Sequence, residues 1–291
     1  MNTFVKSIPR IRLRTLRMIR GRAAGDYNSK RSSDTGFEFD ALRTYEQGDD
    51  VRRIDWNSSV RTGSLMMRSF REQHNRTIIL MIDLSLSTYA GSGPELKCHV
   101  IHIVANSLGF AAQASRDALG ICITYNDSIM HYVPPRTGNA HIMHCIATIS
   151  KTVTALAEQQ KHATIPVLQK NNILHALPRD AWVIVITDGL VKNYETWWKQ
   201  LTLRHTLTIV RVRDRYEKTV PTFCTFRCYD PEDATKATRV VMSHALQHQS
   251  TTWYEQQVAY ARRLGISLVD LIAGSPYEST LRLFFEQGAA R

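Results

Sequence analysis

The sequence predicts an α/β fold: a doubly wound, mostly parallel sheet with helices on both faces. Two apolar runs, residues 77–82 and 182–187, show no polar alternation, which is typical of strands buried on both faces of a parallel sheet. Segments with helical spacing of apolar residues separate these runs from the other expected strands. Alternating strands and helices favour a parallel sheet, because consecutive parallel strands need a crossover that a helix usually provides.

Each expected element has a local pattern. The expected strands are short apolar runs, at residues 65–70, 77–82, 118–124, 129–133, 182–187, 206–212 and 266–272. The expected helices are longer and carry apolar residues on one face, at residues 91–115, 138–160, 164–177, 194–204, 251–264 and 277–286. Asn126 and Asp127 predict a tight turn that makes a hairpin of 118–124 and 129–133. We expect this hairpin to end at Pro134, since proline cannot donate to a strand ladder.

Composition divides the chain into three parts, residues 1–35, 36–75 and 76–291. Residues 1–31 carry nine lysines and arginines against one aspartate, so a basic arm supplies most of the formal charge of +11. Residues 36–75 alternate aromatic, acidic and arginine residues with little helical or strand period. We expect this irregular segment to pack on the main domain through ion pairs and buried aromatics such as Trp56. The main domain then occupies residues 76–291.

The composition also excludes some classes of protein. With 291 residues, 43% of them hydrophobic, the chain can form one large or two modest globular domains. No stretch approaches the roughly 18 apolar residues of a membrane span, and the N-terminus has no apolar core of a signal peptide. Five scattered cysteines fit a reducing compartment better than a disulfide framework. We therefore expect a cytoplasmic protein.

Oxygen-bearing side chains follow both of the most apolar strands. Asp83, Ser85 and Ser87 come directly after the first strand at a spacing of two, so in an extended chain they point to one side. Asp188 follows the second strand and can reach the same crevice at the carboxyl ends of the strands. Such oxygens suit Mg²⁺ or Mn²⁺, because a hard cation needs only one or two carboxylates and keeps several waters. In the alternative interpretation, the aspartates cap helices and the serines bind loop amides.

The chain resembles the bacterial family called "domain of unknown function 58". The resemblance covers nearly all of the sequence from Gly36 onward and rests on a long signature with several later motifs. These are Gly-Phe-Glu-Phe at 36–39, Leu-Arg-Thr-Tyr-Glu-Gln-Gly-Asp-Asp-Val-Arg-Arg-Ile-Asp-Trp at 42–56, Val-Arg-Thr-Gly at 60–63, Asp83-x-Ser85-x-Ser87, Pro134-Pro135-Arg136-x-Gly138, Thr187-Asp188-Gly189 and Asp214-x-x-Glu217-x-x-x-Pro221. Members resemble von Willebrand factor A domains, and the resemblance therefore implies that fold.

The resemblance also implies a metal-ion-dependent adhesion site. Such a site takes its ligands from a D-x-S-x-S loop, from a threonine in a second loop and from an aspartate in a third. The implied set is Asp83, Ser85, Ser87, Thr164 and Asp188, with Thr137 as the alternative threonine. Thr164 is chosen because it stands just before the helix that precedes strand 182–187. The sequence departs from the family pattern after Ser87, where Thr88 and Tyr89 replace the usual methionine.

The sequence is compatible with three functions. The first is a metal-dependent protein-interaction module in which the cation takes a Glu or Asp from a client protein. The resemblance implies partnership with a MoxR-type AAA+ ATPase, in complex maturation or in envelope or stress functions, and no enzymatic activity. The second is a metal-assisted phosphohydrolase or nuclease that uses Asp49, Asp50, Asp55 and Asp83. The third is an adaptor whose basic arm binds an anionic membrane surface at the inner leaflet; nucleic acid is less favoured, because the arm has few aromatics for stacking.

Overall fold

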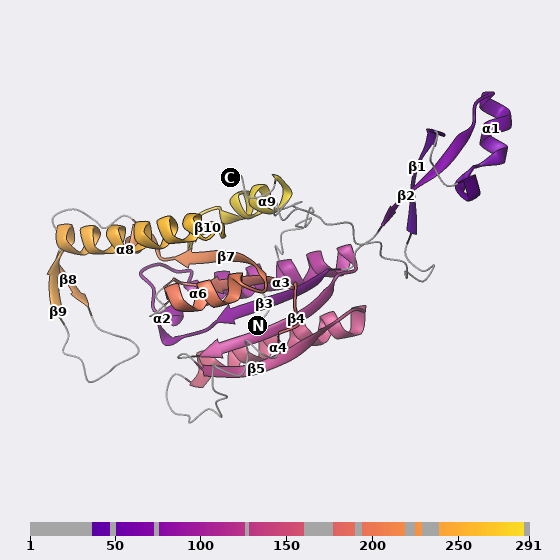
Figure 1. The fold of residues 1–291 in the computed structure, drawn as a ribbon. Helices are drawn as coiled ribbons and strands as arrows, with labels where there is room; N and C mark the ends of the chain where they lie inside the picture. Colours follow the sequence, from indigo (N-terminus) through magenta and orange to yellow (C-terminus); the bar gives the residue numbers. More distant parts are fainter. Residues whose placement is uncertain are drawn as a thin grey trace. The chain divides into compact units, whose positions relative to one another are not determined.

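The computed structural model describes residues 37–46, 51–72, 76–125, 128–159, 177–189, 194–218, 225–228 and 239–287. The chain falls into two compact units, one spanning Arg17–Asn75 and the other containing Arg76–Arg291. Figure 1 labels most of their helices and strands.

The smaller unit contains a two-stranded antiparallel sheet and a short helix. Its elements are β1 (Phe37–Thr44), the 3₁₀ turn η1 (Val51–Arg53), α1 (Trp56–Thr62) and β2 (Met66–Glu72). The two strands pair from Phe37 opposite Glu72 to Thr44 opposite Met66, with an irregularity after Phe39. The strand expected at residues 65–70 is present as β2, and it pairs with β1 in a separate two-stranded sheet.

The helix of this unit has a recognisable start and stop. The Asp55 carboxylate accepts a hydrogen bond from the Ser58 amide at 3.0 Å, as an N-cap does. Gly63 follows the helix with φ of 71°, the left-handed conformation that glycine adopts at low cost. The indole of Trp56, at the first helical position, is 62% exposed, so it is not buried within this unit, and its packing on the main domain stays a prediction. A capped helix and a two-stranded sheet thus form the described part of this segment.

The larger unit is built on a six-stranded sheet. Its strands are β3 (Thr77–Asp83), β4 (Ala118–Tyr125), β5 (Ser128–Arg136), β6 (Trp182–Thr187), β7 (Thr206–Arg213) and β10 (Ser267–Ile272). They lie in the order β10-β7-β6-β3-β4-β5, and each neighbouring pair is parallel except β4 with β5. The prediction of a mostly parallel sheet is confirmed. β3 lies inside the sheet, which explains why its apolar run has no polar alternation.

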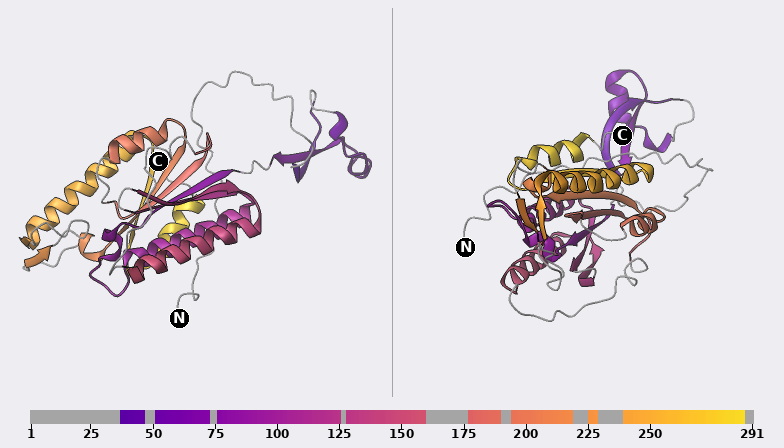
Figure 2. Two further views of the ribbon diagram at one scale, coloured as in Figure 1. Left: turned by 90° about the horizontal axis from the view of Figure 1, so that it is seen from below. Right: turned by 90° about the vertical axis from the view of Figure 1, so that its left-hand side faces the viewer.

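Helices cover both faces of this sheet, as Figure 2 shows. One face packs on α3 (Lys97–Ser115), α4 (Asn139–Gln159) and α9 (Tyr277–Gln287), and the other packs on α6 (Tyr194–Thr202) and α8 (Ser243–Arg263). Along β3, Leu80 and Ile82 face the first layer and Ile79 and Met81 face the second. All four are at most 2% exposed. Each such side chain stabilises the fold by about 1.5–3 kcal/mol relative to exposure.

The hairpin of β4 and β5 extends further than the sequence indicated. β5 continues through Pro134 and Pro135 to Arg136. The expected stop at Pro134 is wrong, because β5 is the edge strand and prolines on an edge remove no ladder bond that the sheet needs. Opposite these prolines lies Gly120, where a Cβ atom would stand 2.9 Å from the Pro135 nitrogen. The close approach of the two strands here requires glycine.

Other elements begin later or earlier than expected. A single turn, α2 (Leu86–Tyr89), follows β3, and α3 begins at Lys97 rather than near residue 91. α8 begins at Ser243, well before the expected start at 251. A four-residue helix, α7 (Arg215–Lys218), and a small antiparallel pair, β8 (Thr225–Cys228) with β9 (Arg239–Met242), precede α8. The helix expected at 164–177 lies almost wholly outside the described residues. Of the helices that are described, none combines the length and apolarity that a membrane crossing requires.

Candidate functional site

The candidate site lies where the central strands end. Asp83 is the last residue of β3, opposite Thr124 of β4, and the preceding Ile82 pairs with Ile186 of β6. The loops after β3 and β6 therefore leave the same edge of the sheet side by side. This is the place where open parallel sheets bind their ligands.

The carboxylate of Asp83 joins these two loops. Its Oδ1 accepts a hydrogen bond from the Ser85 amide at 3.1 Å, and its Oδ2 accepts one from the Thr187 hydroxyl at 3.0 Å. The Thr187 hydroxyl in turn accepts the Gly189 amide at 3.1 Å. Because both oxygens accept fixed donors, the carboxylate is oriented before any ligand arrives. Thr187 is thus a positioning residue that the sequence reasoning missed.

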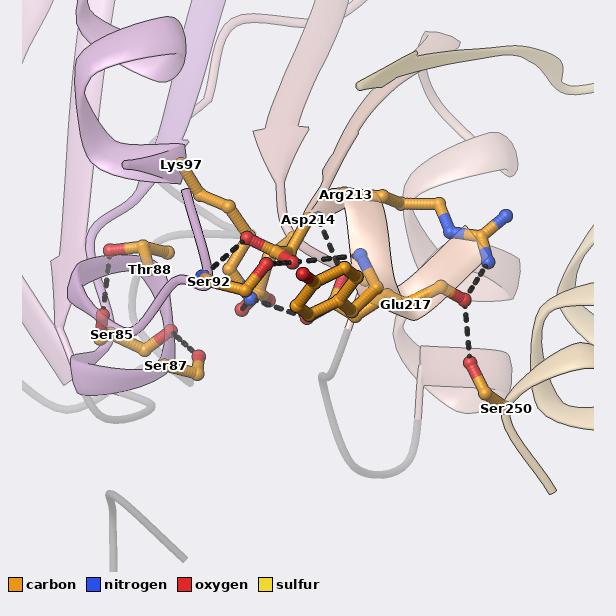
Figure 3. A network of polar contacts seen from close by, with 12 residues as sticks. Ser85, Ser87, Thr88, Ser92, Lys97, Arg213, Asp214, Glu217 and Ser250 are labelled. Carbon is orange, nitrogen blue, oxygen red and sulfur yellow. Dashed lines mark hydrogen bonds and ion pairs between the residues drawn. The ribbon is translucent and has the colours of Figure 1, made fainter. Parts of the chain in front are cut away.

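Two serine hydroxyls form the second part of the site. The Ser85 and Ser87 Oγ atoms lie 2.9 Å apart, and the two residues are 6% and 4% exposed (Figure 3). The Thr88 hydroxyl donates to the Ser85 carbonyl at 2.7 Å, which fixes the turn of α2 that holds both serines. Neighbouring ligands of an octahedral Mg²⁺ stand about 3.0 Å apart when each lies about 2.1 Å from the ion. The spacing of the serine oxygens fits two such ligands.

Asp188 has a different environment. Its carboxylate is 1% exposed, and its Oδ2 lies 3.1 Å from the ammonium of Lys97, which is itself 2% exposed. The same ammonium lies 2.8 Å from Oε1 of Glu217 (Figure 3). Burial alone lowers the pKa of Lys97, but the two carboxylates outweigh this and raise its pKa above the ordinary value. Lys97 is therefore a buried, charged cation between two anions.

The far side of this ion cluster is held by hydrogen bonds. Oε2 of Glu217 accepts the Asp214 amide at 3.0 Å and the Tyr254 hydroxyl at 3.1 Å. The Asp214 carboxylate accepts the amides of Ser92 and Tyr216, each at 2.9 Å, and the Ser92 hydroxyl (Figure 3). Burial raises the pKa of Asp214, but the hydrogen bonds from Ser92 and Tyr216 and the charge of Lys97 together outweigh burial and lower that pKa below its usual range. These bonds fix Glu217 in place.

The loop that carries Asp188 is also fixed from behind. Gln257 donates its side-chain amide to the Gly189 carbonyl at 2.6 Å. Gly189 has φ of 82°, and a Cβ atom there would stand 2.6 Å from Cδ of Arg211. Arg211 is held by both oxygens of Asp270, at 2.5 and 2.8 Å. The turn after β6 therefore requires glycine and is packed against charged groups that are already paired.

A cavity of about 440 Å³ lies beside this network. Its lining includes Arg211 and Arg213 from β7, Asp270 from β10, and Tyr254 and Arg262 from α8. The guanidinium of Arg213 stands 3.7 Å from the centre of the Tyr254 ring, and that of Arg211 stands 4.7 Å from it. The arginines thus contact protein groups, and we assign no ligand to the cavity.

The structure brings together part of the expected metal set. Asp83, Ser85 and Ser87 form one hydrogen-bonded cluster, and Asp188 contacts Lys97 instead. Thr164 lies outside the described residues, and the alternative Thr137 is exposed after β5. Within the described ranges, no group of three or more His, Cys, Asp or Glu side chains is placed to hold a metal. A metal here would therefore depend on hydroxyl oxygens.

The sequence reasoning also missed Lys97 and Glu217. A weak signal was present for each. Lys97 is a lone lysine at the start of a helix whose following residues Cys98, Val100 and Ile101 are apolar and buried. Glu217 was noted only as part of a motif with Asp214 after β7. Neither pattern indicates which carboxylate or ammonium the side chain meets, because the partners are far apart in sequence.

The chain is similar to several proteins of unknown role. It is 26% identical over 187 residues to an uncharacterized protein of Mycobacterium bovis and to one of Mycobacterium tuberculosis. The match covers 64% of this chain and 58% of each relative, so the chain spans less than two thirds of their length.

Two solved structures are also similar. The conserved hypothetical protein BatB from Bacteroides thetaiotaomicron matches at 12% identity with a TM-score of 0.42, covering 73% of this chain and 98% of that one. An uncharacterized membrane spanning protein from Vibrio fischeri matches at 10% identity with a TM-score of 0.22, covering 71% of this chain and 95% of that one.

A family model spans most of the chain. The family described as "Protein of unknown function DUF58" matches residues 41–260, a range that includes the Asp83 loop, Lys97, Asp188 and Glu217. The match begins within the smaller unit and ends in α8. The chain therefore belongs to the DUF58 family.

Proposed function

We propose that this chain is a metal-dependent protein-interaction module. In this proposal a divalent cation, Mg²⁺ or Mn²⁺, binds to the hydroxyls of Ser85 and Ser87 and accepts a carboxylate of a partner protein as a further ligand. The observation that carries the proposal is the 2.9 Å separation of the two buried Oγ atoms at the end of a central parallel strand. Mg²⁺, when bound, would supply a Lewis-acidic contact point for the partner.

The residues around the serines fit this role. Asp83 has both carboxylate oxygens engaged by protein donors, so we propose that it acts through water and by orienting the loop. Two neutral hydroxyls leave the charge of a cation largely uncompensated, which favours an anionic ligand from outside. Asp188 would contribute its charge from farther away, since its carboxylate contacts Lys97.

We further propose that the larger unit is a von Willebrand factor A-like domain. The parallel sheet with one antiparallel edge strand, the helices on both faces, and the D-x-S-x-S loop at the end of a central strand support this assignment. The resemblance of the sequence to its family supports a MoxR-type AAA+ ATPase as the partner and a client protein as the source of the Glu or Asp. The arm proposed to bind an anionic membrane at the inner leaflet lies outside the described residues.

The enzymatic alternative has less support. Of its four proposed carboxylates, Asp49 and Asp50 lie outside the described residues, and Asp55 caps α1. Asp83 is held by an amide and a hydroxyl, which suits orientation rather than abstraction of a proton. A hydrolysis assay on phosphodiesters and nucleotides with Mg²⁺ or Mn²⁺ tests this alternative directly.

The proposed function is tested by capture of a purified MoxR-type AAA+ ATPase on the immobilised full chain. We expect retention in Mg²⁺, loss on chelation, and loss in the double variant Ser85→Ala/Ser87→Ala. Ser115→Ala removes an exposed hydroxyl at the end of α3 and should retain the ATPase as the unmodified chain does. Retention that is equal with and without chelator would contradict metal dependence.

A further inference from the structure

The starting observation is that a buried lysine contacts the carboxylate of Asp188. The Lys97 ammonium lies 3.1 Å from Asp188 Oδ2 and 2.8 Å from Glu217 Oε1. Lys97 and Asp188 are 2% and 1% exposed, so water contributes little to either charge. A buried charge of this kind persists only where an opposite charge compensates it.

The two carboxylates differ in what else they can do. Asp188 directly follows Thr187, whose hydroxyl contacts Asp83, so Asp188 stands one residue from the oxygen cluster. Glu217 belongs to α7 after β7, is 25% exposed, and is fixed by the Asp214 amide and the Tyr254 hydroxyl. If Asp188 turned from Lys97, the ammonium would keep Glu217 as a counter-ion. The cluster thus gives Lys97 a second, fixed counter-ion, Glu217, beside Asp188.

We propose that Lys97 acts as a built-in competitor of the divalent cation for Asp188. In the metal-free protein the ammonium holds Asp188, and a cation at Ser85 and Ser87 gains the Asp188 charge only when that carboxylate leaves Lys97. Metal affinity is then set by the balance of charge around Lys97 as well as by the oxygen ligands. This inference rests on the proposed function, because it needs a metal at the serines.

The proposal predicts opposite effects for two single substitutions. Lys97→Met removes the competitor and should tighten Mn²⁺ binding about tenfold or more, because a nearby like charge is lost and Asp188 is released. Glu217→Gln leaves Lys97 with less counter-charge, so the ammonium holds Asp188 more strongly and Mn²⁺ binding should weaken about threefold or more. A purely structural role for Lys97 would not produce effects of opposite sign.

Two further variants control for misfolding and for effects that do not involve Asp188. Lys97→Met/Glu217→Gln removes one positive and one negative charge together, so it does not leave two carboxylates without an ammonium. This double variant should also bind Mn²⁺ more tightly than the unmodified chain. In an Asp188→Asn background, Lys97→Met should change Mn²⁺ affinity much less, since no carboxylate is released there. Lys199→Met changes an exposed lysine of α6 and serves as the matched control.

The experiment is a titration of each full-length variant with Mn²⁺, in which electron paramagnetic resonance reports the free ion and circular dichroism confirms the fold. Tighter binding by the Lys97 variants and weaker binding by Glu217→Gln support the proposal, as does binding that is detectable only once Lys97 is removed. If the unmodified chain binds Mn²⁺ through Ser85 and Ser87 but folded Lys97→Met/Glu217→Gln binds no more tightly, this inference is overturned and the proposed function stands. If no folded variant binds Mn²⁺, both are overturned.

Discussion

The loops after β3 and β6 leave the same edge of the sheet, and each carries an aspartate, yet the two carboxylates have opposite surroundings. Asp83 meets an amide and a hydroxyl from its own and the neighbouring loop, whereas Asp188 meets an ammonium 91 positions away in sequence. Strand order places both carboxylates at the edge. The residues that each carboxylate contacts in the fold make them different. Asp83 orients the hydroxyl cluster, whereas the charge of Asp188 is compensated by Lys97.

The largest expected effect concerns the neutralised carboxylate. Lys97→Met should lower the free energy of unfolding by about 3–5 kcal/mol, because removing one partner of a buried ion pair leaves an uncompensated charge. Urea denaturation monitored by circular dichroism measures this. The exposed Lys199→Met should change the free energy by no more than about 0.5 kcal/mol. Equal effects of the two substitutions would contradict the assigned charge pairing.

A third aspartate at a strand end, Asp214 after β7, should make the free energy of unfolding depend on pH. Burial raises its pKa, but the hydrogen bonds from Ser92 and Tyr216 and the charge of Lys97 together make the pKa lower in the folded chain than in the unfolded chain. The stabilisation is therefore complete above the unfolded pKa of about 3.9 and is lost as pH falls through the lower folded value. Ser92→Ala should cost about 1.5–3 kcal/mol at pH 7. The cost should shrink below about pH 4; a constant cost in urea titrations from pH 7 to pH 3 would count against this account.

The smallest expected effect lies in the other unit. Trp56→Ala should change the free energy of unfolding by no more than about 0.5 kcal/mol, because the side chain is 62% exposed. Trp198→Ala in α6 should cost about 3–5 kcal/mol, because that indole is 3% exposed and packs on Tyr194 at 4.8 Å between ring centres. Thermal unfolding of both variants compares them; a large loss in Trp56→Ala would show that the indole is buried.

The same contrast explains what the sequence could predict. The cluster of Asp83, Ser85 and Ser87 is readable because its members are two residues apart and directly follow an apolar run. The pairing of Asp188 with Lys97 is not, because it depends on how α3 meets the loop after β6. Expected boundaries failed for a related reason. A proline interrupts a strand in the interior of a sheet but is tolerated in an edge strand. β5 is an edge strand, and the local sequence around Pro134 does not indicate this position.

The Asp55 cap and Gly63 show the opposite case. Both are local signals for the ends of α1, but the alternation of aromatic and charged residues drew attention to burial instead. Residue type predicts a core position for Trp56, but its position directly after an N-cap does not indicate which side of the helix it faces. In this segment, the capping residues Asp55 and Gly63 therefore predict the structure better than the composition does.

The central claim is that the hydroxyl cluster at the end of β3 binds a divalent cation, and calorimetric titration with Mg²⁺ and Mn²⁺ tests it most directly. The unmodified chain should bind, and Asp83→Ala should lose binding while its circular dichroism spectrum stays that of the folded chain. Its free energy of unfolding should fall by about 1–3 kcal/mol, because the Ser85 amide and the Thr187 hydroxyl lose their acceptor. Ser115→Ala should bind as the unmodified chain does. Equal affinity of Asp83→Ala and the unmodified chain would contradict the claim, as would the absence of binding by both of these chains and by folded Lys97→Met/Glu217→Gln.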